Sequence, residues 1–345
     1  MNARPGVESR PQPPGHGSWR GSRVCVTGGA GFIGSHLAEA LVAEGAHVAV
    51  IDDLSGGRKA NLAAVEGRIA FHHGSILDAA ALVRAVAGCE IVFHQAAAVS
   101  VPESVEHPDR CFAINDEGTF AVLEAARREG VRRVIYAGSS SAYGSGPGAG
   151  SSRRGDRREG AAAEGRCAES MAPAPRSPYA ASKLAGEAWV QGHCACYGLE
   201  AVTLRYFNVY GSRQRAQSAY AAVIPRFVAA LRRGERPTIF GTGEQTRDFV
   251  SVSDVVQANL LAGSSPGAPQ GEPINVGSGE GSSLLELLEL LGELMRVPAR
   301  PRFEPARPGD VLHSVASIER AARLLGYVPQ VGLRRGLELL LEDAS

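Results

Sequence analysis

The fold of this chain is decided by the stretch Arg23-Val24-Cys25-Val26-Thr27-Gly28-Gly29-Ala30-Gly31-Phe32-Ile33-Gly34. Residues 23–27 predict a short buried strand, and residues 35–42 have the pattern of a helix. Gly28 permits the tight turn between them, Gly31 lets the backbone approach a ligand, and Gly34 lets the helix pack closely on the strand. This order presents the N-terminus of a helix to an anion, and we expect that anion to be a pyrophosphate.

A second predicted strand, residues 47–51, ends at Asp52, near the spacing of about twenty residues at which an acid binds the ribose of an adenine dinucleotide. The carboxylate would repel the 2′-phosphate of NADP, and no arginine directly follows Asp52 and Asp53. The sequence therefore predicts an NAD site. A glycine turn without a ligand is the alternative, and the strand, helix and acid in register argue against it.

Strands and helices alternate from Arg23 to about residue 210, which predicts an α/β fold with a doubly wound parallel sheet of the Rossmann type. We expect strands near 23–27, 47–51, 69–72, 90–94, 132–137 and 201–206, and helices near 34–44, 79–87, 113–129 and 178–197. Residues 21–210 would form the NAD-binding domain. Shorter elements in 211–345 predict a smaller mixed α/β cap that binds the substrate, with some segments returning to the larger domain. The ligand should lie between the cap and the carboxyl ends of the strands. Residues 1–20 are expected to be a disordered tail, and 145–170 a mobile insertion.

The composition excludes several classes of protein. Of 345 residues, 44% are hydrophobic, which suffices for a packed core, and 36 basic residues balance 36 acidic ones, so no net field attracts nucleic acid or an anionic membrane. No apolar run reaches the length of about 18 residues that a membrane span needs. The six cysteines show neither zinc-ligand spacing nor a secreted disulfide framework, so we expect no metal and a reducing cytoplasm.

A candidate catalytic pair lies in the run Ser177-Pro178-Tyr179-Ala180-Ala181-Ser182-Lys183, where the tyrosine and the lysine share one face of a predicted helix. Ser177 suits the N-cap and Pro178 the first turn, so the helix should begin just before the pair. A fixed cation favours the phenolate, and we expect Lys183 to lower the pKa of Tyr179 from about 10 toward neutral pH. Spacing alone would fit an aromatic side chain beside a solvated lysine; the glycine turn favours a catalytic base.

With the glycine turn, Asp52 and this pair in register, the chain resembles the extended short-chain dehydrogenase/reductase family, and within it the nucleotide-sugar 4-epimerases of the UDP-glucose/UDP-N-acetylglucosamine type. The resemblance covers roughly residues 23 to 340. Its landmarks occur in family order: Ile51-Asp52-Asp53-Leu54-Ser55, Phe93-His94-Gln95-Ala96-Ala97, Ser139-Ser140-Ser141-Ala142-Tyr143-Gly144, Leu204-Arg205-Tyr206-Phe207-Asn208, Thr246-Arg247-Asp248-Phe249 and Arg307-Pro308-Gly309-Asp310.

The resemblance implies that Ser139, Tyr179 and Lys183 are the catalytic residues, with Ser139 relaying the proton and Asn115 holding the catalytic helix. It implies NAD as the cofactor, contacted by Gly28, Gly31, Phe32, Ile33, Gly34, Asp52, Ser75, Ile76, Gln95, Ala96, Ala97, Tyr179, Lys183 and Tyr206. It implies a UDP-sugar contacted by Ser140, Ser141, Asn208, Ala222, Val223, Arg247, Arg307, Asp310 and Ser314. Arginines suit a diphosphate because their donors form a fork. The alternatives are an ordinary polar turn for the serine triplet and surface ion pairs for the arginines.

The reaction that the resemblance implies is inversion at C4 of the sugar. Tyr179 takes the proton of the 4-hydroxyl while hydride leaves C4 for NAD, and the transient 4-keto sugar turns over and takes the hydride back on its other face. The dehydratases and decarboxylases of the family place an acid soon after the catalytic hydroxyl, where this chain has Ser140 and Ser141. Ser75 replaces the usual aspartate near the adenine.

The substrate is the least determined part of this interpretation. Ser314, four residues past Asp310, stands where epimerases confined to unacetylated sugars carry a tyrosine, so we expect UDP-N-acetylglucosamine and UDP-N-acetylgalactosamine to interconvert. Val99 and Gln217 depart from the acetyl-accepting relatives, and Ser314 could be a simple surface serine. The alternatives are a UDP-glucose/UDP-galactose or UDP-glucuronate 4-epimerase, a one-way NAD-dependent dehydrogenase or reductase, or a non-catalytic NAD-sensing regulator, which would typically lack the tyrosine–lysine pair. The resemblance also implies a homodimer.

Overall fold

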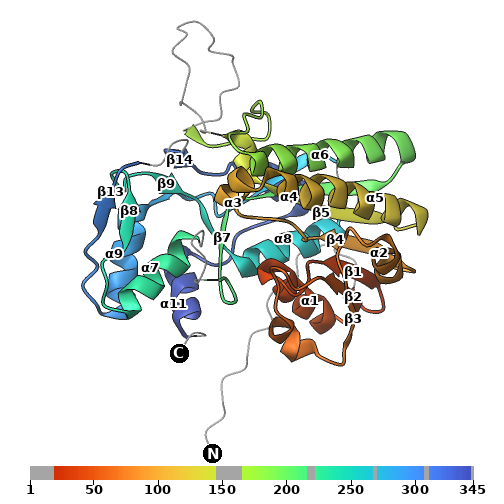
Figure 1. Ribbon diagram of the computed structural model, residues 1–345, viewed down its shortest axis with the longest axis horizontal. Helices are drawn as coiled ribbons and strands as arrows, with labels where there is room; N and C mark the ends of the chain where they lie inside the picture. Colours follow the sequence, from red (N-terminus) through yellow and green to blue (C-terminus); the bar gives the residue numbers. More distant parts are fainter. Residues whose placement is uncertain (1–18, 145–164, 216–221, 267–269, 307–310, 343–345) are drawn as a thin grey trace, which may run out of the picture.

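A computed structural model describes residues 19–144, 165–215, 222–266, 270–306 and 311–342 of the chain. The described residues form a layered α/β body around one large sheet and a smaller part built from short strands and three helices, which lies to the left in Figure 1. The expected disordered tail falls almost entirely outside the described residues, as does most of the expected insertion.

The large sheet has seven strands, and each pairs with its neighbours in the parallel sense. Its order is β11-β6-β5-β4-β1-β2-β3, so the doubly wound Rossmann-type fold predicted from the sequence is confirmed. The strands are β1 (Arg23–Thr27), β2 (His47–Asp52), β3 (Ile69–His73), β4 (Ile91–His94), β5 (Arg133–Ser139), β6 (Glu200–Tyr206) and β11 (Pro273–Val276). From β1 the chain builds the sheet first toward β3 and then, from β4, toward β11 on the other side. A ligand is expected at this change of direction, beyond the carboxyl ends of β1 and β4.

Helices cover both faces of the sheet because its strands are apolar on both sides. One face packs against α1 (Phe32–Ala43), α8 (Val252–Ser264) and α10 (Glu319–Leu325), through buried residues such as Leu37, Leu41, Val255 and Leu325. The other packs against α2 (Ala79–Val86), α5 (Gly118–Arg128) and α6 (Pro178–Tyr197), through residues such as Leu82, Leu123 and Val190. In Figure 1, α5 and α6 lie together along the top of the body with α3 (Val101–Glu106) and α4 (Pro108–Phe112).

The smaller part has its own apolar core beneath three amphipathic helices. The helices are α7 (Val223–Arg232), α9 (Leu284–Met295) and α11 (Leu333–Glu342), and they bury Phe227, Leu287, Leu291 and Leu337. A capping box starts α9, because Ser283 and Glu286 each accept from the other's backbone N–H. The short strands are β7 (Asn208–Tyr210), β8 (Thr238–Phe240), β9 (Thr246–Arg247), β10 (Phe249–Ser251), β12 (Ser282–Ser283), β13 (Arg302–Glu304) and β14 (His313–Ser314).

A buried carboxylate ties the smaller part to the large sheet. Asp248, between β9 and β10, is fully buried and accepts four hydrogen bonds, from the backbone N–H of Ser278, Gly279 and Ala316 and from the hydroxyl of Ser278. The two turn residues follow β11 and Ala316 follows β14. Four donors compensate for the desolvation of the carboxylate, so one side chain fixes three segments that are far apart in sequence.

The segment that follows residue 164 joins the smaller part. The backbone N–H of Cys167 donates to the carbonyl of Val315, and that of Ser317 donates to the carbonyl of Cys167, so the segment adds a bridge beside β14. Residues 145–164, which held most of the expected insertion, lie outside the described residues. No helix in the described ranges combines the length and the apolar character needed to cross a membrane.

Candidate active site

The glycine turn between β1 and α1 is too tight for a side chain at Gly28 or Gly34. Gly28 has φ of +66°, and a Cβ there would lie 2.7 Å from the backbone of Ala96. A Cβ on Gly34 would lie 2.3 Å from the carbonyl oxygen of Gly28, so this glycine packs against the turn itself, whereas we expected it to pack on the strand. Gly31 is the N-cap of α1 and provides no side-chain hydrogen bond, which leaves the N–H groups of the first turn facing outward.

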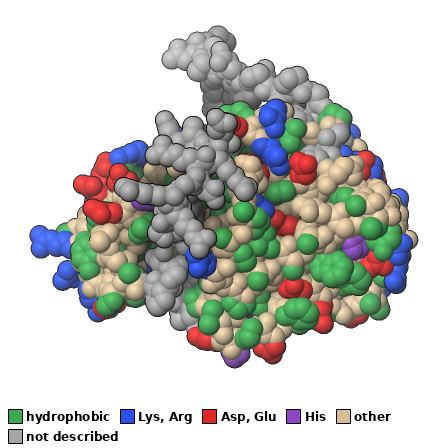
Figure 2. All heavy atoms as spheres, turned by 90° about the horizontal axis from the view of Figure 1, so that it is seen from above, with side chains coloured by type: hydrophobic (Ala, Val, Ile, Leu, Met, Phe, Trp, Pro, Cys, Tyr) green, Lys and Arg blue, Asp and Glu red, His purple; other side chains and the backbone are tan. Residues whose placement is uncertain are grey.

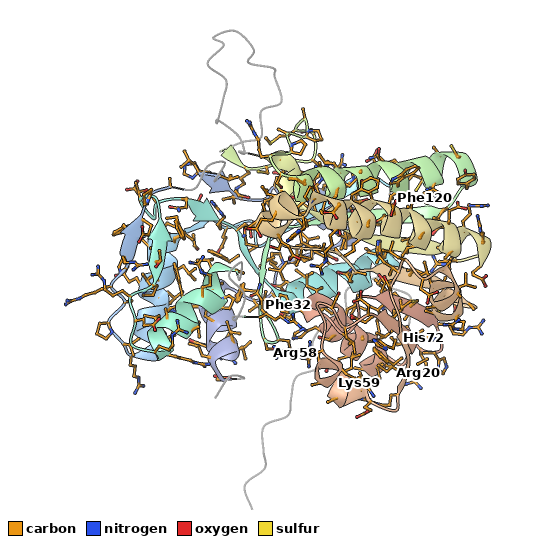
Figure 3. The ribbon with its side chains drawn as sticks, viewed as in Figure 1. Arg20, Phe32, Arg58, Lys59, His72 and Phe120 are labelled. Atoms are coloured by element: carbon orange, nitrogen blue, oxygen red, sulfur yellow. The ribbon has the colours of Figure 1, made fainter. Side chains whose placement is uncertain are left out.

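The turn faces the smaller part of the molecule. Figure 3 shows Phe32, the first residue of α1, at the end of the α/β body that lies against the smaller part. The segment after β7 crosses this end: both terminal nitrogens of Arg213 contact α1, one donating to the Ser35 hydroxyl and the other to both carboxylate oxygens of Glu39 at 2.7 and 2.8 Å. A segment that leads on from β7 therefore packs against α1, the helix that follows the glycine turn.

Asp52 ends β2 directly beside this turn. Its carboxylate accepts from the backbone N–H of Ala30 at 2.9 Å and from that of Leu54 at 2.8 Å, one bond to each oxygen. Each oxygen keeps a second acceptor position for a ribose hydroxyl. Burial is the largest influence on the pKa of Asp52 and raises it, while the two backbone donors lower it. The residues present therefore fit the adenosine end of NAD.

The other residues predicted to contact NAD lie at the same edge of the sheet. Ser75 and Ile76 follow β3, and Gln95, Ala96 and Ala97 follow β4. Tyr206 ends β6, and its hydroxyl forms a network with the side chains of Gln95 and Asn259 at 2.8 to 3.4 Å. Asn259 comes from α8, beyond the region expected to form this domain, so sequence reasoning missed it.

Helix α6, which carries the predicted catalytic pair, begins where the sequence predicted, and its first turn is fully bonded. The Ser177 hydroxyl accepts from the N–H of Ala180, and Pro178 has no N–H to satisfy. The N–H of Tyr179 donates to the hydroxyl of Ser104 on α3 at 3.1 Å, and Ser104 is buried. Capping and this contact between helices fix the position of Tyr179.

Lys183 lies one turn along α6 and is buried, with its Nζ donating to the carbonyl oxygen of Ala137 at 3.0 Å. Burial lowers the pKa of Lys183 to about 8, and Cys111, Glu187 and Asp116 oppose that shift. The pKa of Tyr179 is raised, because burial outweighs the hydrogen bond from Ser139 that lowers it. Our expectation that Lys183 brings the pKa of Tyr179 below its ordinary value is therefore wrong for the protein without ligands.

Ser139 ends β5 and caps the short helix η3 (Ser140–Tyr143). Its Oγ accepts from the N–H of Ser141 at 3.2 Å and from the hydroxyl of Ser141 at 2.9 Å. Ser139 lowers the pKa of Tyr179 as a hydrogen-bond donor would, and Lys183 bonds to the carbonyl of Ala137, two residues before Ser139. The three predicted catalytic residues therefore lie together near the end of β5.

Asn115 connects the catalytic helix to the segment after β4. It lies in η2 (Ala113–Glu117), a π-helical turn between α4 and α5, and turns of this kind are frequent at functional sites. Its Oδ1 accepts from the N–H of Ala98 at 2.8 Å, while Nδ2 donates to the carbonyl of Ala98 and to the hydroxyl of Ser182. These contacts fit the predicted supporting role of Asn115.

A buried ion pair joins α6 to the sheet. Arg205 on β6 donates from Nε and one terminal nitrogen to the two carboxylate oxygens of Glu187, at 2.9 and 2.7 Å. The guanidinium also lies 4.8 Å from the centre of the Tyr143 ring, at the end of η3. Glu187 is one helical turn after Lys183, so the pair anchors the catalytic face of α6.

Two of the predicted substrate residues are neighbours on the smaller part. In the register of β9 and β14, Arg247 lies opposite Ser314, so their side chains point to the same side of this three-stranded sheet. His313 and Thr246 are opposite each other on the other side and are hydrogen-bonded at 2.9 Å. Asn208 begins β7 beside β10, and Ala222 and Val223 lie at the start of α7. Arg307, Asp310 and Gln217 lie outside the described residues.

Within the described ranges, no group of three or more His, Cys, Asp or Glu side chains is arranged to hold a metal ion. His94, at the end of β4, is hydrogen-bonded through its two ring nitrogens to the hydroxyls of Thr27 and Thr119, at 2.8 and 3.0 Å. Burial lowers the pKa of His94 to about 3, so the imidazole is neutral.

Comparison with known proteins agrees with this geometry. The family model described as NAD dependent epimerase/dehydratase family matches residues 24–277. The chain is 38% identical over 324 residues to the UDP-glucose 4-epimerase of Mycolicibacterium smegmatis, an alignment that covers 93% of this chain and 97% of that protein.

Two solved structures are similar over nearly their whole length. The UDP-glucose 4-epimerase of Thermotoga maritima, determined with UDP-glucose, superposes with a TM-score of 0.83 at 36% identity, covering 93% of this chain and 97% of that one. The UDP-N-acetylglucosamine 4-epimerase of Methanobrevibacter ruminantium, in complex with UDP-N-acetylmuramic acid, also has a TM-score of 0.83, at 33% identity, covering 94% and 99%.

Proposed function

This chain belongs to the NAD dependent epimerase/dehydratase family, and we propose that it interconverts UDP-N-acetylglucosamine and UDP-N-acetylgalactosamine at C4. The broader prediction from the sequence, an NAD-dependent nucleotide-sugar 4-epimerase, is confirmed by the family and by the relatives. What the proposal adds is the N-acetylated sugar, the assignment of individual residues, and the assembly of the protein.

We assign the proton chemistry to Tyr179, which would take the proton of the sugar 4-hydroxyl and later return it. Bound NAD would supply the hydride acceptor and donor at C4. Lys183 would hold the nicotinamide ribose through its buried ammonium, and its charge would stabilise the phenolate once the site is filled. Ser140 and Ser141, where dehydratases and decarboxylases carry an acid, provide hydroxyls only. An elimination that needs a carboxyl group at this position is therefore disfavoured.

The residues of the glycine turn, Asp52 and the segments after β3 and β4 would hold the dinucleotide along the carboxyl edge of the sheet. Asn208, Ala222, Val223 and Arg247 would hold the UDP-sugar from the smaller part, together with Arg307 and Asp310. We accordingly propose that residues 21–210 bind NAD and that the part after residue 211 is mainly a substrate cap. The segments α8, β11 and α10 are exceptions, because they pack into the large body.

The observation that carries the choice of sugar is the position of Ser314 opposite Arg247. If Arg247 binds the diphosphate, Ser314 lies on the same side of the sheet, close to the hexose that follows the diphosphate. A serine there leaves room that the tyrosine of epimerases confined to unacetylated sugars would fill. Val99, which departs from the acetyl-accepting relatives, is 70% exposed and is therefore not part of the packed core.

The test compares kcat/KM for UDP-N-acetylglucosamine and UDP-glucose in the wild type and in Ser314→Tyr. We expect the tyrosine to lower the ratio of acetylated to unacetylated turnover about tenfold or more, since one methylene group in a pocket is already worth about 10–200-fold and a phenol ring takes up more room. His313→Tyr is the matched control, because it adds the same ring to the opposite side of β14 and should leave the ratio unchanged. An unchanged ratio in Ser314→Tyr would remove the main support for the acetylated substrate and favour UDP-glucose.

We also propose a homodimer formed through the helices at the top of Figure 1. These helices, α3 to α6, expose several large hydrophobic side chains: Val101, Val105, Phe112, Phe120, Trp189 and Tyr197. Figure 2 looks down on this face and shows hydrophobic side chains spread across it. Several large hydrophobic side chains exposed on neighbouring helices are typical of an interface. The molar mass in solution would test this, with Trp189→Glu expected to give the monomer.

All six cysteines are free, and five of them are buried. Free thiols persist in a reducing compartment, and we propose that the enzyme acts in the cytoplasm.

A further inference from the structure

The hydroxyl of Ser139 has both of its acceptor positions filled by one neighbour. A serine hydroxyl can donate one hydrogen bond and accept two. Here the oxygen accepts from the backbone N–H of Ser141 at 3.2 Å and from the Ser141 hydroxyl at 2.9 Å. The hydrogen of Ser139 is therefore the part of this group that is left to donate, and Ser139 lowers the pKa of the Tyr179 phenol as a donor would.

We propose that Ser141 is a positioning residue that fixes the Ser139 hydroxyl as a donor to Tyr179, so that Tyr179 accepts the sugar proton directly and Ser139 does not relay it. This inference rests on the proposed epimerase function, and it assigns to Ser141 a role different from the sugar contact expected from the sequence.

A relay through Ser139 would need its oxygen to accept the proton of the sugar 4-hydroxyl. That needs a lone pair, and both are already bonded to Ser141. In the direct route the O–H bond of the sugar breaks, its proton bonds to the phenolate oxygen of Tyr179, and its electrons form the C4 carbonyl while hydride leaves C4 for NAD. Ser139 keeps its own proton throughout and stabilises the phenolate by donating to it. The hydrogen bond from Ser139 lowers the pKa of Tyr179 against the larger effect of burial, as this role requires.

The same two-serine arrangement also occurs at the start of α8, where it has no role in our account of catalysis. Ser251 caps α8, accepting from the N–H of Ser253 at 3.3 Å, and the two hydroxyls are 2.8 Å apart. If Ser141 served only the cap, removal of its hydroxyl should therefore have the same effect on the enzyme as removal of the Ser253 hydroxyl. Ser253→Ala removes the same hydroxyl from the same kind of cap and is the matched control for Ser141→Ala.

The experiment measures kcat, KM and the pH profile of kcat/KM for Ser141→Ala, Ser141→Thr and Ser253→Ala. In Ser141→Ala the Ser139 hydroxyl regains a free lone pair and can rotate away, so we expect kcat to fall about tenfold. The acidic limb should move to higher pH, because a phenolate that loses a fixed donor has a higher pKa. KM should change less than about twofold. Ser141→Thr keeps the hydroxyl and should restore the wild-type kcat and the wild-type position of the acidic limb. Ser253→Ala should match the wild type in kcat and in the pH profile.

A second readout does not depend on turnover. Ultraviolet titration of tyrosinate in the NAD-bound protein, with the Tyr179→Phe curve subtracted, gives the midpoint of Tyr179 alone. We expect this midpoint to rise in Ser141→Ala and to return in Ser141→Thr.

An unchanged midpoint and pH profile in Ser141→Ala, or an effect confined to KM, would overturn the inference and leave Ser141 as a sugar contact or a cap. If the wild type turned over neither UDP-N-acetylglucosamine nor UDP-glucose, the proposed function would fail, whereas the tyrosinate midpoint would still decide the role of Ser141.

Discussion

The ion pair between Glu187 and Arg205 should be the most costly single contact to break beneath the catalytic helix. Both side chains are almost fully buried, at 5% and 4% exposure, and two hydrogen bonds of 2.9 and 2.7 Å join them. Removing one partner of a buried pair leaves an uncompensated charge, which costs about 3–5 kcal/mol, or roughly two to four powers of ten in the folding equilibrium. We therefore expect Glu187→Leu to lower the free energy of unfolding by that amount.

Removing both charges should restore most of the loss. One terminal nitrogen of Arg205 is buried without a hydrogen-bond partner, so the native pair is itself incompletely compensated. In Glu187→Leu with Arg205→Met neither charge of the pair remains buried, and the further losses are the attraction between Glu187 and Lys183 and the contact of the guanidinium with the Tyr143 ring, the latter worth about 0.5–2 kcal/mol. The double variant should lie within about 2 kcal/mol of the wild type.

Urea unfolding followed by tryptophan fluorescence measures these differences, since Trp19 and Trp189 both lie in the α/β body. The matched control is Glu293→Leu, which breaks an equally bidentate pair with Arg334 at the surface, where water replaces the lost partner and stability should scarcely change. A Glu187→Leu loss as small as that of the control, or a double variant as unstable as the single one, would refute this reasoning.

Three further predictions concern the cofactor and the lysine. NAD should bind much more tightly than NADP in titrations, because the Asp52 carboxylate repels a 2′-phosphate; equal affinities would place Asp52 away from the ribose. Gly28→Ala should lose NAD from the purified protein, because a Cβ would lie 2.7 Å from the Ala96 backbone at a φ of +66°; NAD retained at the wild-type level would contradict the proposed turn geometry. The kcat/KM of the wild type should fall above about pH 8, because burial lowers the pKa of Lys183 to about 8 and its charge is lost as the pH rises through that value; activity that climbs steadily to pH 10 would argue against a charged Lys183.

The local parts of this protein could be predicted from the sequence because their signals are local. The first β-strand, the glycine turn and the helix that follows form one continuous stretch, residues 23–43, with strong steric demands. The cap of α6 is likewise read from Ser177 and Pro178 alone. Six of the seven strands of the sheet fall within one or two residues of their expected ranges for the same reason.

The parts that were missed depend on contacts between distant segments. The sequence predicted that some segments after residue 210 return to the large body but not which ones, and only packing against β6 and α1 identifies β11 and α8. Asn259 reaches Tyr206 across 53 residues, and no local pattern marks it as part of the site. The raised pKa of Tyr179 is also a tertiary effect. It follows from the burial of the phenol, which cannot be seen from the sequence spacing between Tyr179 and Lys183.

The direct test of the account is turnover of UDP-N-acetylglucosamine by Tyr179→Phe, measured together with thermal stability and the NAD retained through purification. The phenol supports no core contact in our account, so the variant should remain folded and keep its NAD, while kcat falls about 10²–10⁴-fold with loss of the base. A folded, NAD-containing Tyr179→Phe protein that epimerises at close to the wild-type rate would contradict the assignment of Tyr179 as the catalytic base.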